Sequence, residues 1–179
     1  MVFAFDFGIT TRLDLPARPA ISLGYAAGSG DSNPGDGVDH TYRQTGLHAN
    51  EGKLGGITQI KYYGHAFEPD LSNLKIYTAG LSFNWDNKRS IEIVFHHYRL
   101  DEFVDELELG KLEGELNRQS KDLGNEIDLI VAEKGFAGLP WLTASFVAAY
   151  FKPGAAFAEK NNDPAAFFKL ELVAKFGDD

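Results

Sequence analysis

Ten ionisable side chains fall on the polar side of segments in which apolar and polar residues alternate. A water-filled barrel interior would use such charges to select ions, because a low-dielectric wall concentrates their field on a passing solute. A small closed barrel has room only for side chains, and the same charges would then pair with one another. The sequence leaves both roles open. The ten side chains are Asp6, Lys61, His65, Glu92, His96, Glu126, Asp128, Lys169, Glu171 and Lys175.

Metal binding has one weak candidate, a Gly/Pro-rich loop with oxygen-bearing side chains at short spacing. Oxygen ligands at such spacing suit Ca²⁺, although no glutamate follows at the twelfth position of an EF-hand loop. Asp-Gly and Asn-Pro pairs are also ordinary turn formers, so we expect no cofactor apart from this Ca²⁺ candidate. His96 and His97 are adjacent and would point to opposite faces of a strand, which prevents joint chelation. The loop residues are Asp31, Asn33, Asp36 and Asp39.

Catalysis and nucleic-acid binding find no support in the sequence. The chain has no Gly-x-Ser-x-Gly, no His-Glu-x-x-His and no phosphate-cradling loop, so we expect no enzymatic activity. A net charge of −9 argues against a nucleic-acid partner. The absence of cysteine excludes disulfides and thiolate-bound metals.

The elements that would position these residues are strands, because alternation with period two dominates the chain. We expect one all-β domain over residues 1–179, with long loops at 28–56 and 101–123. The second loop is acidic; we interpret it as a solvated loop, with a short helix as the alternative. Residues 41–47 could add a ninth strand to eight others. Those eight cover residues 3–10, 21–27, 57–67, 77–85, 91–96, 126–131, 142–150 and 168–176.

The two faces of these strands differ in a way that favours a membrane protein. One face carries Phe, Leu, Ile and Tyr, whereas the other is rich in Gly, Ala, Ser and Thr with scattered charges. The inner face of a soluble β-sandwich needs bulky apolar residues for packing. The inward face of a barrel whose outer face contacts lipid does not need them. Aromatic residues near the strand ends, such as Trp85, Trp141 and Tyr150, fit interfacial girdles. The pattern therefore predicts an antiparallel transmembrane β-barrel of the bacterial outer membrane, contacting membrane lipid.

Several segments resemble the alginate-export family of outer-membrane barrels, in its C-terminal half. The strand at 168–176, which ends on an aromatic residue, also looks like the signature recognised by the barrel-assembly machinery. The strand and Gly/Asp-rich loop at 22–37 resemble the family, as do the Leu-Gly-x-Glu-x-Asp-Leu and Phe-x-Pro-Gly elements at 123–129 and 151–154. Further similar stretches are 42–47, 62–64 and 70–74.

The resemblance implies an export channel for an acidic polysaccharide, typically alginate, in a barrel of about 16 to 18 strands. This chain would supply about half of it, so a missing N-terminal half or a second chain would complete the pore. The family's positively charged constriction would be represented here by Arg43, Lys61, Lys169 and Lys175. We therefore predict a channel for anionic or polar solutes. The alternatives are a closed eight-stranded membrane barrel without transport and a soluble ligand-binding barrel.

Overall fold

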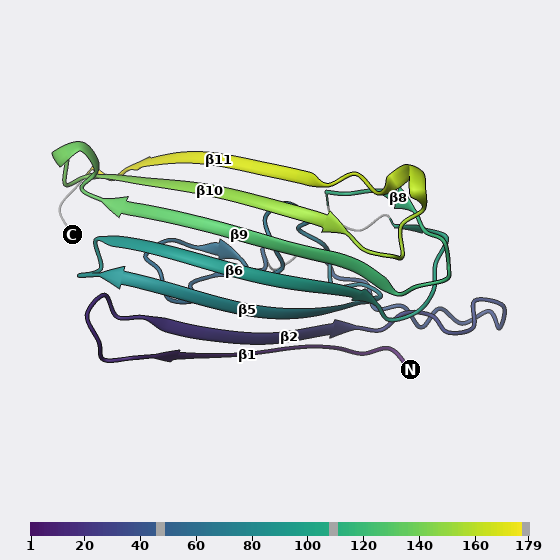
Figure 1. Cartoon of the computed structure of the whole chain (residues 1–179). Coiled ribbons are helices and arrows are strands. Elements are labelled where there is room, and N and C mark those ends of the chain that lie inside the picture. The colour runs from purple at the N-terminus through teal and green to yellow at the C-terminus, as the bar shows by residue number, and fades with distance from the viewer. Residues whose placement is uncertain (46–48, 108–110, 177–179) are drawn as a thin grey trace.

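The computed structural model describes residues 1–45, 49–107 and 111–176, and its dominant feature is one antiparallel sheet. Seven long strands lie side by side in chain order (Figure 1). The described residues contain no helix long and apolar enough to cross a membrane. The seven strands are β1 (Ala4–Arg12), β2 (Ala20–Gly28), β5 (Leu74–Trp85), β6 (Arg89–Leu100), β9 (Asp122–Lys134), β10 (Leu142–Pro153) and β11 (Ala165–Ala174).

The outer face of the sheet is the apolar face expected from the alternation. Seven large residues that the pattern assigns to one face are all between 39% and 71% exposed, so the assignment is confirmed. The register joins them into a continuous band, for example Ile93 opposite both Leu81 and Leu129. The seven are Phe7, Leu23, Leu81, Ile93, Leu129, Phe146 and Leu170.

Aromatic rings border this band at both ends of the strands. Near one end, the Tyr25 and Tyr77 rings lie 4.9 Å apart. Near the other end, the Trp141 and Phe176 rings lie 5.2 Å apart, and Trp85 is exposed on β5. Amphipathic rings at two levels flanking an apolar band are typical of strands that cross a bilayer.

The connections divide by length between the two ends of the sheet. Three short connections, between β1 and β2, β5 and β6, and β9 and β10, lie at the left in Figure 1. The long connections, residues 29–73 and 101–121, lie at the right. We call the two ends the turn end and the loop end.

The expected strand at 57–67 is wrong. Only Ile60–Lys61 (β4) is extended in a ladder there, paired with Glu51–Gly52 (β3). The long loop therefore runs from 29 to 73 rather than from 28 to 56, and both long connections share one end. The suggested ninth strand is absent over residues 41–45, and the rest of it lies outside the described residues.

The acidic connection forms a small hairpin where a helix was the alternative. Glu106–Leu107 (β7) pairs with Gly114–Glu115 (β8), and no helix occurs in its described residues. Two short 3₁₀ turns, Phe136–Gly138 and Glu159–Asn161, lie in other connections.

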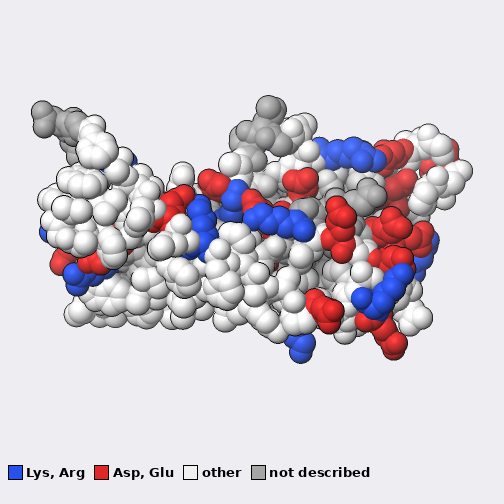
Figure 2. Space-filling model, turned by 90° about the horizontal axis from the view of Figure 1, so that it is seen from above, with Lys and Arg blue, Asp and Glu red and all other residues white. Residues whose placement is uncertain are grey.

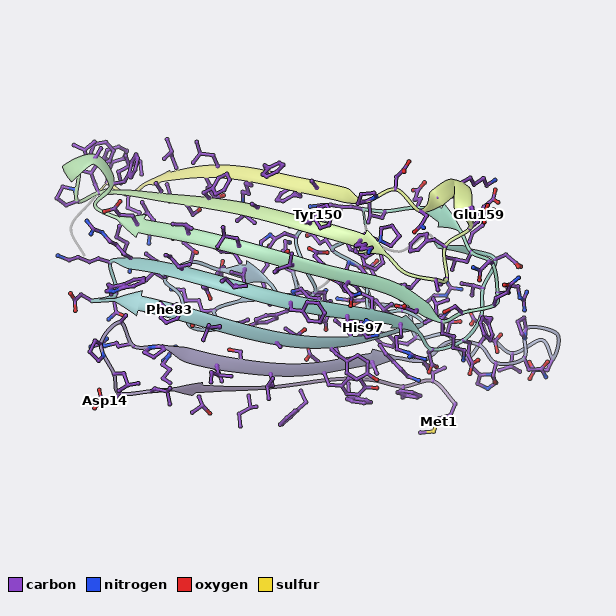
Figure 3. The ribbon with its side chains drawn as sticks, in the orientation of Figure 1. Met1, Asp14, Phe83, His97, Tyr150 and Glu159 are labelled. Carbon is purple, nitrogen blue, oxygen red and sulfur yellow. The ribbon has the colours of Figure 1, made fainter. Side chains whose placement is uncertain are left out.

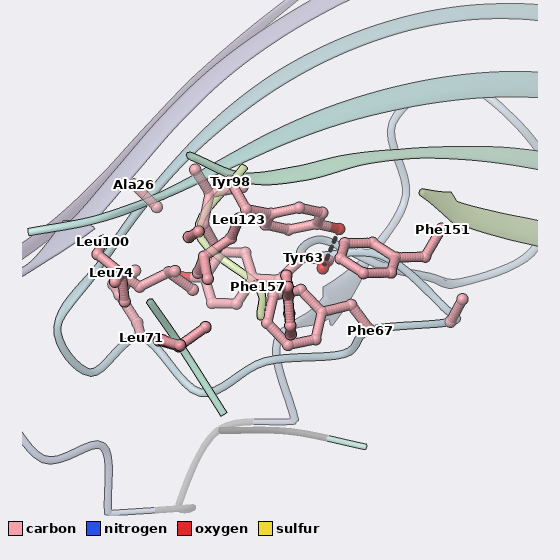
Figure 4. Packing of buried hydrophobic residues seen from close by; sticks show 14 of the residues in the cluster. Ala26, Tyr63, Phe67, Leu71, Leu74, Tyr98, Leu100, Leu123, Phe151 and Phe157 are labelled. Carbon is pink, nitrogen blue, oxygen red and sulfur yellow. Dashed lines mark hydrogen bonds between the residues drawn. The ribbon is translucent and has the colours of Figure 1, made fainter. Parts of the chain in front are cut away.

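The main hydrophobic core lies at the loop end, between the inner face of the sheet and residues of the connections (Figure 4). Phe67, from the long loop, meets Tyr98 edge-on at 4.9 Å and Phe151 at 5.2 Å between ring centroids. A second, smaller cluster packs Ile60 of β4 against Val94 and Ile130 of the sheet. The 29–73 loop is therefore folded onto the inner face of the sheet.

Candidate functional site: the inner face of the sheet

The long loop is attached to the inner face through a buried carboxylate. Glu126 on β9 is 1% exposed and accepts hydrogen bonds from the backbone N–H groups of His65, Ala66 and Phe67 at 2.6–2.9 Å. The Tyr98 hydroxyl lies 3.1 Å from Glu126 Oε2 and 2.9 Å from the Tyr63 carbonyl oxygen. Charge-assisted bonds of this kind are stronger than neutral ones. The carboxylate thus fixes the 63–67 backbone against β6 and β9.

A glycine makes this close approach geometrically accessible. Gly64 has φ +93°, and a Cβ atom there would overlap the Tyr98 hydroxyl and the Glu126 carboxylate. Only glycine adopts such a conformation without strain while leaving room for the sheet side chains. The contact therefore depends on Gly64 as well as on Glu126.

A second attachment lies nearer the turn end. Glu92 on β6 is 1% exposed and accepts a hydrogen bond from the Gly55 N–H at 3.3 Å. Ser90 and Asn84 add bonds to the backbone of Ile57 and Gly55. We call residues 53–69, held by both attachments, the inner segment.

Between the inner segment and strands β10 and β11 an open groove of about 710 Å³ remains. Six lysines and three glutamates line it, together with His65, Phe167 and other uncharged residues, so its charged side chains are predominantly cationic. Figure 2 shows Lys and Arg side chains gathered in the middle of the molecule, with Asp and Glu concentrated towards the loop end. We call this the lysine groove; its charged residues are Lys53, Lys61, Lys111, Lys134, Lys169, Lys175, Glu51, Glu68 and Glu171.

Ion pairs neutralise part of the groove. Lys61 lies between Glu51 at 2.5 Å and Glu68 at 2.6 Å, and Lys111 shares Glu68. Lys169 pairs with Glu171 at 2.9 Å. Within the described residues, the other three groove lysines, Lys53, Lys134 and Lys175, form no ion pair. These three lysines consequently supply most of the groove's uncompensated positive charge.

The comparison with known proteins decides which family this sheet and groove represent. The sequence profile of the family described as Alginate export matches residues 2–168. The chain belongs to the alginate export family.

Two curated relatives carry the same printed name, Alginate production protein AlgE. The Pseudomonas aeruginosa protein is 29% identical over 168 residues, which cover 87% of this chain and 33% of that protein. The Azotobacter vinelandii protein is 29% identical over 139 residues, covering 72% of this chain and 28% of that protein. The chain thus spans about a third of the length of the curated relatives that it matches.

Within this alginate-export chain, nine of the eleven residues expected to line a lumen fall into two groups. Lys61, His65, Lys169, Glu171 and Lys175 all border the lysine groove. The other group is covered by the inner segment and faces no open space. It comprises Glu92, His96, Glu126 and Asp128, each no more than 1% exposed.

Two of the covered residues lie side by side. His96 Nε2 is 3.7 Å from Asp128 Oδ2, and His96 Nδ1 hydrogen-bonds to the Thr78 hydroxyl at 3.0 Å. Asp6 lies elsewhere, at the β1 edge, where it accepts a hydrogen bond from the Tyr63 hydroxyl at 2.9 Å. His96 and Asp128 therefore belong to the packing between the sheet and the inner segment, whereas Asp6 contacts that segment from the exposed edge strand.

Burial changes the protonation of His65. Loss of hydration lowers the pKa of its imidazole to about 4. The His65 ring stacks on Phe167 with centroids 6.2 Å apart. Its Nε2 lies 3.3 Å from the backbone nitrogen of Lys61 and accepts a hydrogen bond from that N–H, which requires Nε2 to be unprotonated. His65 is thus a neutral wall residue of the groove at neutral pH.

Arg43 lies apart from the groove, in the exposed loop, and pairs with Asp39 at 2.8 Å. This hydrogen bond lowers the pKa of the Asp39 carboxyl to about 2. The other Ca²⁺ candidates make local turn contacts: Asp31 and Asp36 accept hydrogen bonds from the backbone N–H groups of Asn33 and Val38. In the described part of the chain, no three His, Asp or Glu side chains gather in an arrangement that could hold a metal ion.

Sequence reasoning missed Lys53, Lys111 and Lys134 as groove residues, and Tyr98 as a partner of Glu126. Lys53 and Lys111 lie in connections, where the period-two pattern gives no facing information. Lys134 ends β9 on the same side as Asp128 and could have been assigned by extending the alternation. Gly55, Gly56 and Gly64 were the available signal that the loop backbone approaches another element closely.

Proposed function

We propose that this chain forms one wall of an outer-membrane channel through which an anionic polysaccharide such as alginate passes. The observation that carries the proposal is the lysine groove, which runs along the inner face of a sheet whose outer face is apolar. A polyuronate carries one carboxylate per sugar, and a row of ammonium groups beside a low-dielectric wall attracts such a chain. The names of the two relatives support alginate as the solute. The mechanism includes no catalytic step and no cofactor.

The proposal extends to the orientation and the completion of the barrel. Bacterial outer-membrane barrels have short periplasmic turns and longer external loops, so the turn end faces the periplasm and the loop end faces outside. Strands β1 and β11 each pair with only one neighbour among the described strands, and further strands, from the same protein or from a second chain, close the wall. The barrel-assembly machinery is the expected partner for insertion.

A planar-bilayer measurement on the full-length protein tests the channel. Replacing Lys134, Lys169 and Lys175 together by Gln should shift the reversal potential towards cation selectivity, because the three remaining lysines are then balanced by the three glutamates and the groove loses its excess positive charge. Block of the current by alginate should weaken about tenfold, equivalent to about 1.4 kcal/mol. Both effects should shrink at 1 M salt, where the Debye length is about 3 Å.

Lys160→Gln is the matched control, because Lys160 lies outside the groove and pairs with Glu115 at 2.6 Å. It should leave selectivity and block unchanged. If the protein conducts but the Lys134, Lys169 and Lys175 substitutions change neither its selectivity nor its block by alginate, the solute assignment is contradicted. A wild-type protein that never conducts favours a different function.

That second function is a structural barrel without transport. The inner segment favours it, because residues 53–69 cover the inner face of β5, β6 and β9 with two buried carboxylate attachments. A barrel whose remaining wall is covered in the same way would enclose side chains rather than water. Absence of single-channel conductance in correctly folded protein, verified by heat-modifiable gel mobility, would support it.

A further inference from the structure

Positively charged side chains follow the outward aromatic residues at the loop end of three strands. On β5, Lys75 is the next outward position after Tyr77, and on β10, Lys152 follows Tyr150. On β6, Arg99 follows Phe95 and His97. Towards the loops, the outward side chains of each strand are thus first apolar, then an aromatic or imidazole ring, and finally a cation. Figure 3 shows His97 and Tyr150 towards this end of their strands and Phe83 towards the other.

The strand register places these cations next to one another. Lys75 lies directly opposite Arg99, two positions beyond the pair of Tyr77 and His97. Asn125 of β9 lies opposite both His97 and Lys152, so it lies between them. We call Lys75, Arg99 and Lys152 the outer cationic row.

Carboxylates neutralise only part of this row. Lys75 pairs with Asp101 at 2.7 Å, and His97 Nδ1 is 4.0 Å from Asp122, which also lies opposite Arg99 in the register. Arg99 and Lys152 are exposed, and neither forms an ion pair with a described residue. Two cations at the level just beyond the tyrosine girdle are therefore available to an external anion.

The turn end differs on the same outer face. Its outward cation on β6, Arg89, is paired with Glu133 of β9 at 2.8 Å. Among the outward-facing cations on the strands themselves, Arg99 and Lys152 at the loop end are therefore unpaired with described residues, whereas Arg89 at the turn end is paired. A membrane whose two leaflets differ in headgroup charge would meet a matching difference in this wall.

We propose that the outer cationic row binds the phosphate groups of a phosphorylated glycolipid in the outer leaflet, with Arg99 and Lys152 as the principal contacts. The inference rests on the orientation given under the proposed function. The acyl chains would lie along the apolar band, Tyr77 and Tyr150 would lie at the interface, and the sugar phosphates would reach the cations. Arginine binds a phosphate through two parallel N–H groups, and lysine adds a point charge. Basic clusters beside a membrane-spanning element are typical lipid-headgroup sites.

Lipid-binding titration of the full-length protein in detergent micelles tests the proposal. The probes are diphosphorylated lipid A and the same lipid without phosphates, with binding followed by native mass spectrometry. The double variant Arg99→Gln/Lys152→Gln should bind the diphosphorylated lipid about tenfold more weakly than the wild type. The two proteins should bind the dephosphorylated lipid equally, because only acyl and sugar contacts remain.

Arg89→Gln serves as the matched control, since it removes an outward charge of the same strand at the turn end. It should leave lipid binding unchanged, and an equal loss in this control would overturn the assignment to the loop end. Undiminished binding of the diphosphorylated lipid by the double variant would also overturn it. Failure of the channel itself is separately visible, because the double variant should keep the wild-type conductance and selectivity.

Discussion

Glu126 and Glu171 are both carboxylates on the inner face of the same sheet, yet their surroundings differ completely. Glu126 is buried under the inner segment and accepts hydrogen bonds from three backbone N–H groups. Glu171 lies in the lysine groove, pairs with Lys169, and keeps 46% of its side chain exposed. An inward position on a strand therefore does not make a charge part of the solute pathway. The inner segment determines which inward charges a solute can reach, because it covers one half of the inner face and leaves the other half open.

Removing each of the two carboxylates in a separate variant tests this difference most directly. Glu126→Ala should destabilise the docking of the inner segment by about 3–5 kcal/mol, because it leaves three buried backbone N–H groups without their acceptor. Hydrogen exchange at the amides of residues 65–67 should accelerate by roughly 100-fold or more. Glu171→Ala, the control in the open half, should leave those amides protected. Equal protection in both variants would show that the carboxylate does not hold the segment.

Gly64→Ala tests the same attachment through the backbone. Alanine at φ +93° costs about 1–2 kcal/mol, and overlap of its methyl group with Tyr98 and Glu126 raises the total to about 2–3 kcal/mol. Gly37→Ala is the control, because Gly37 also has a positive φ of +79°, but its added methyl group would meet no described atom within 4 Å. Limited proteolysis of residues 53–69 should increase for Gly64→Ala alone. Equal cleavage in the two variants would mean that steric overlap contributes nothing.

The smallest expected effect is a pH dependence at His65, on the border between the two halves. Its folded pKa of about 4 lies below the unfolded value of about 6.5, so the unfolded segment binds more protons between these values. Docking stability should therefore be fully present above pH 6.5 and should fall as the pH drops towards 4, by about 1–2 kcal/mol because the ring edge keeps some hydration. Hydrogen exchange at the inner segment from pH 7 to pH 4, corrected for intrinsic rates, measures it. His65→Gln should remove this component, and an unchanged pH profile in that variant would contradict the assignment.

The strands were predictable because membrane contact imposes alternation on each one separately. Leu81 and Ser82, or Ile93 and Val94, reveal their faces from a few neighbouring residues, and the seven strands of the sheet follow. Residues 57–67 misled the same reasoning because Ile57, Ile60, Tyr63 and Phe67 are apolar for another reason. Ile60, Tyr63 and Phe67 pack onto the inner face of the sheet rather than against lipid. The spacing of apolar residues shows that they are shielded from water, but it does not show whether lipid or another part of the protein covers them.

The division of the charges could not be predicted, because it depends on contacts between distant parts of the chain. Glu126 meets residues about sixty positions earlier, and Glu92 meets Gly55 thirty-seven positions earlier. Nothing near Glu126 in the sequence distinguishes it from Glu171. The lysine groove was predictable only in part: Lys169 and Glu171 of β11, and Lys175 just after it, follow from alternation, whereas Lys53 and Lys111 lie in connections.

The two aromatic girdles also define a length, and that length has a consequence for the bilayer itself. Tyr77 and Trp85 are eight positions apart on β5, or roughly 27 Å along the strand at about 3.4 Å per residue. A strand tilt of about 40° reduces the height between them to roughly 21 Å. Bacterial outer membranes are thinner than average bilayers, whose hydrocarbon core is about 30 Å. The wall should therefore fit a bilayer of short-chain lipid without deformation, whereas a bilayer of long-chain lipid would have to thin around it. Hydrophobic mismatch would thus favour the placement of this wall in a thin membrane.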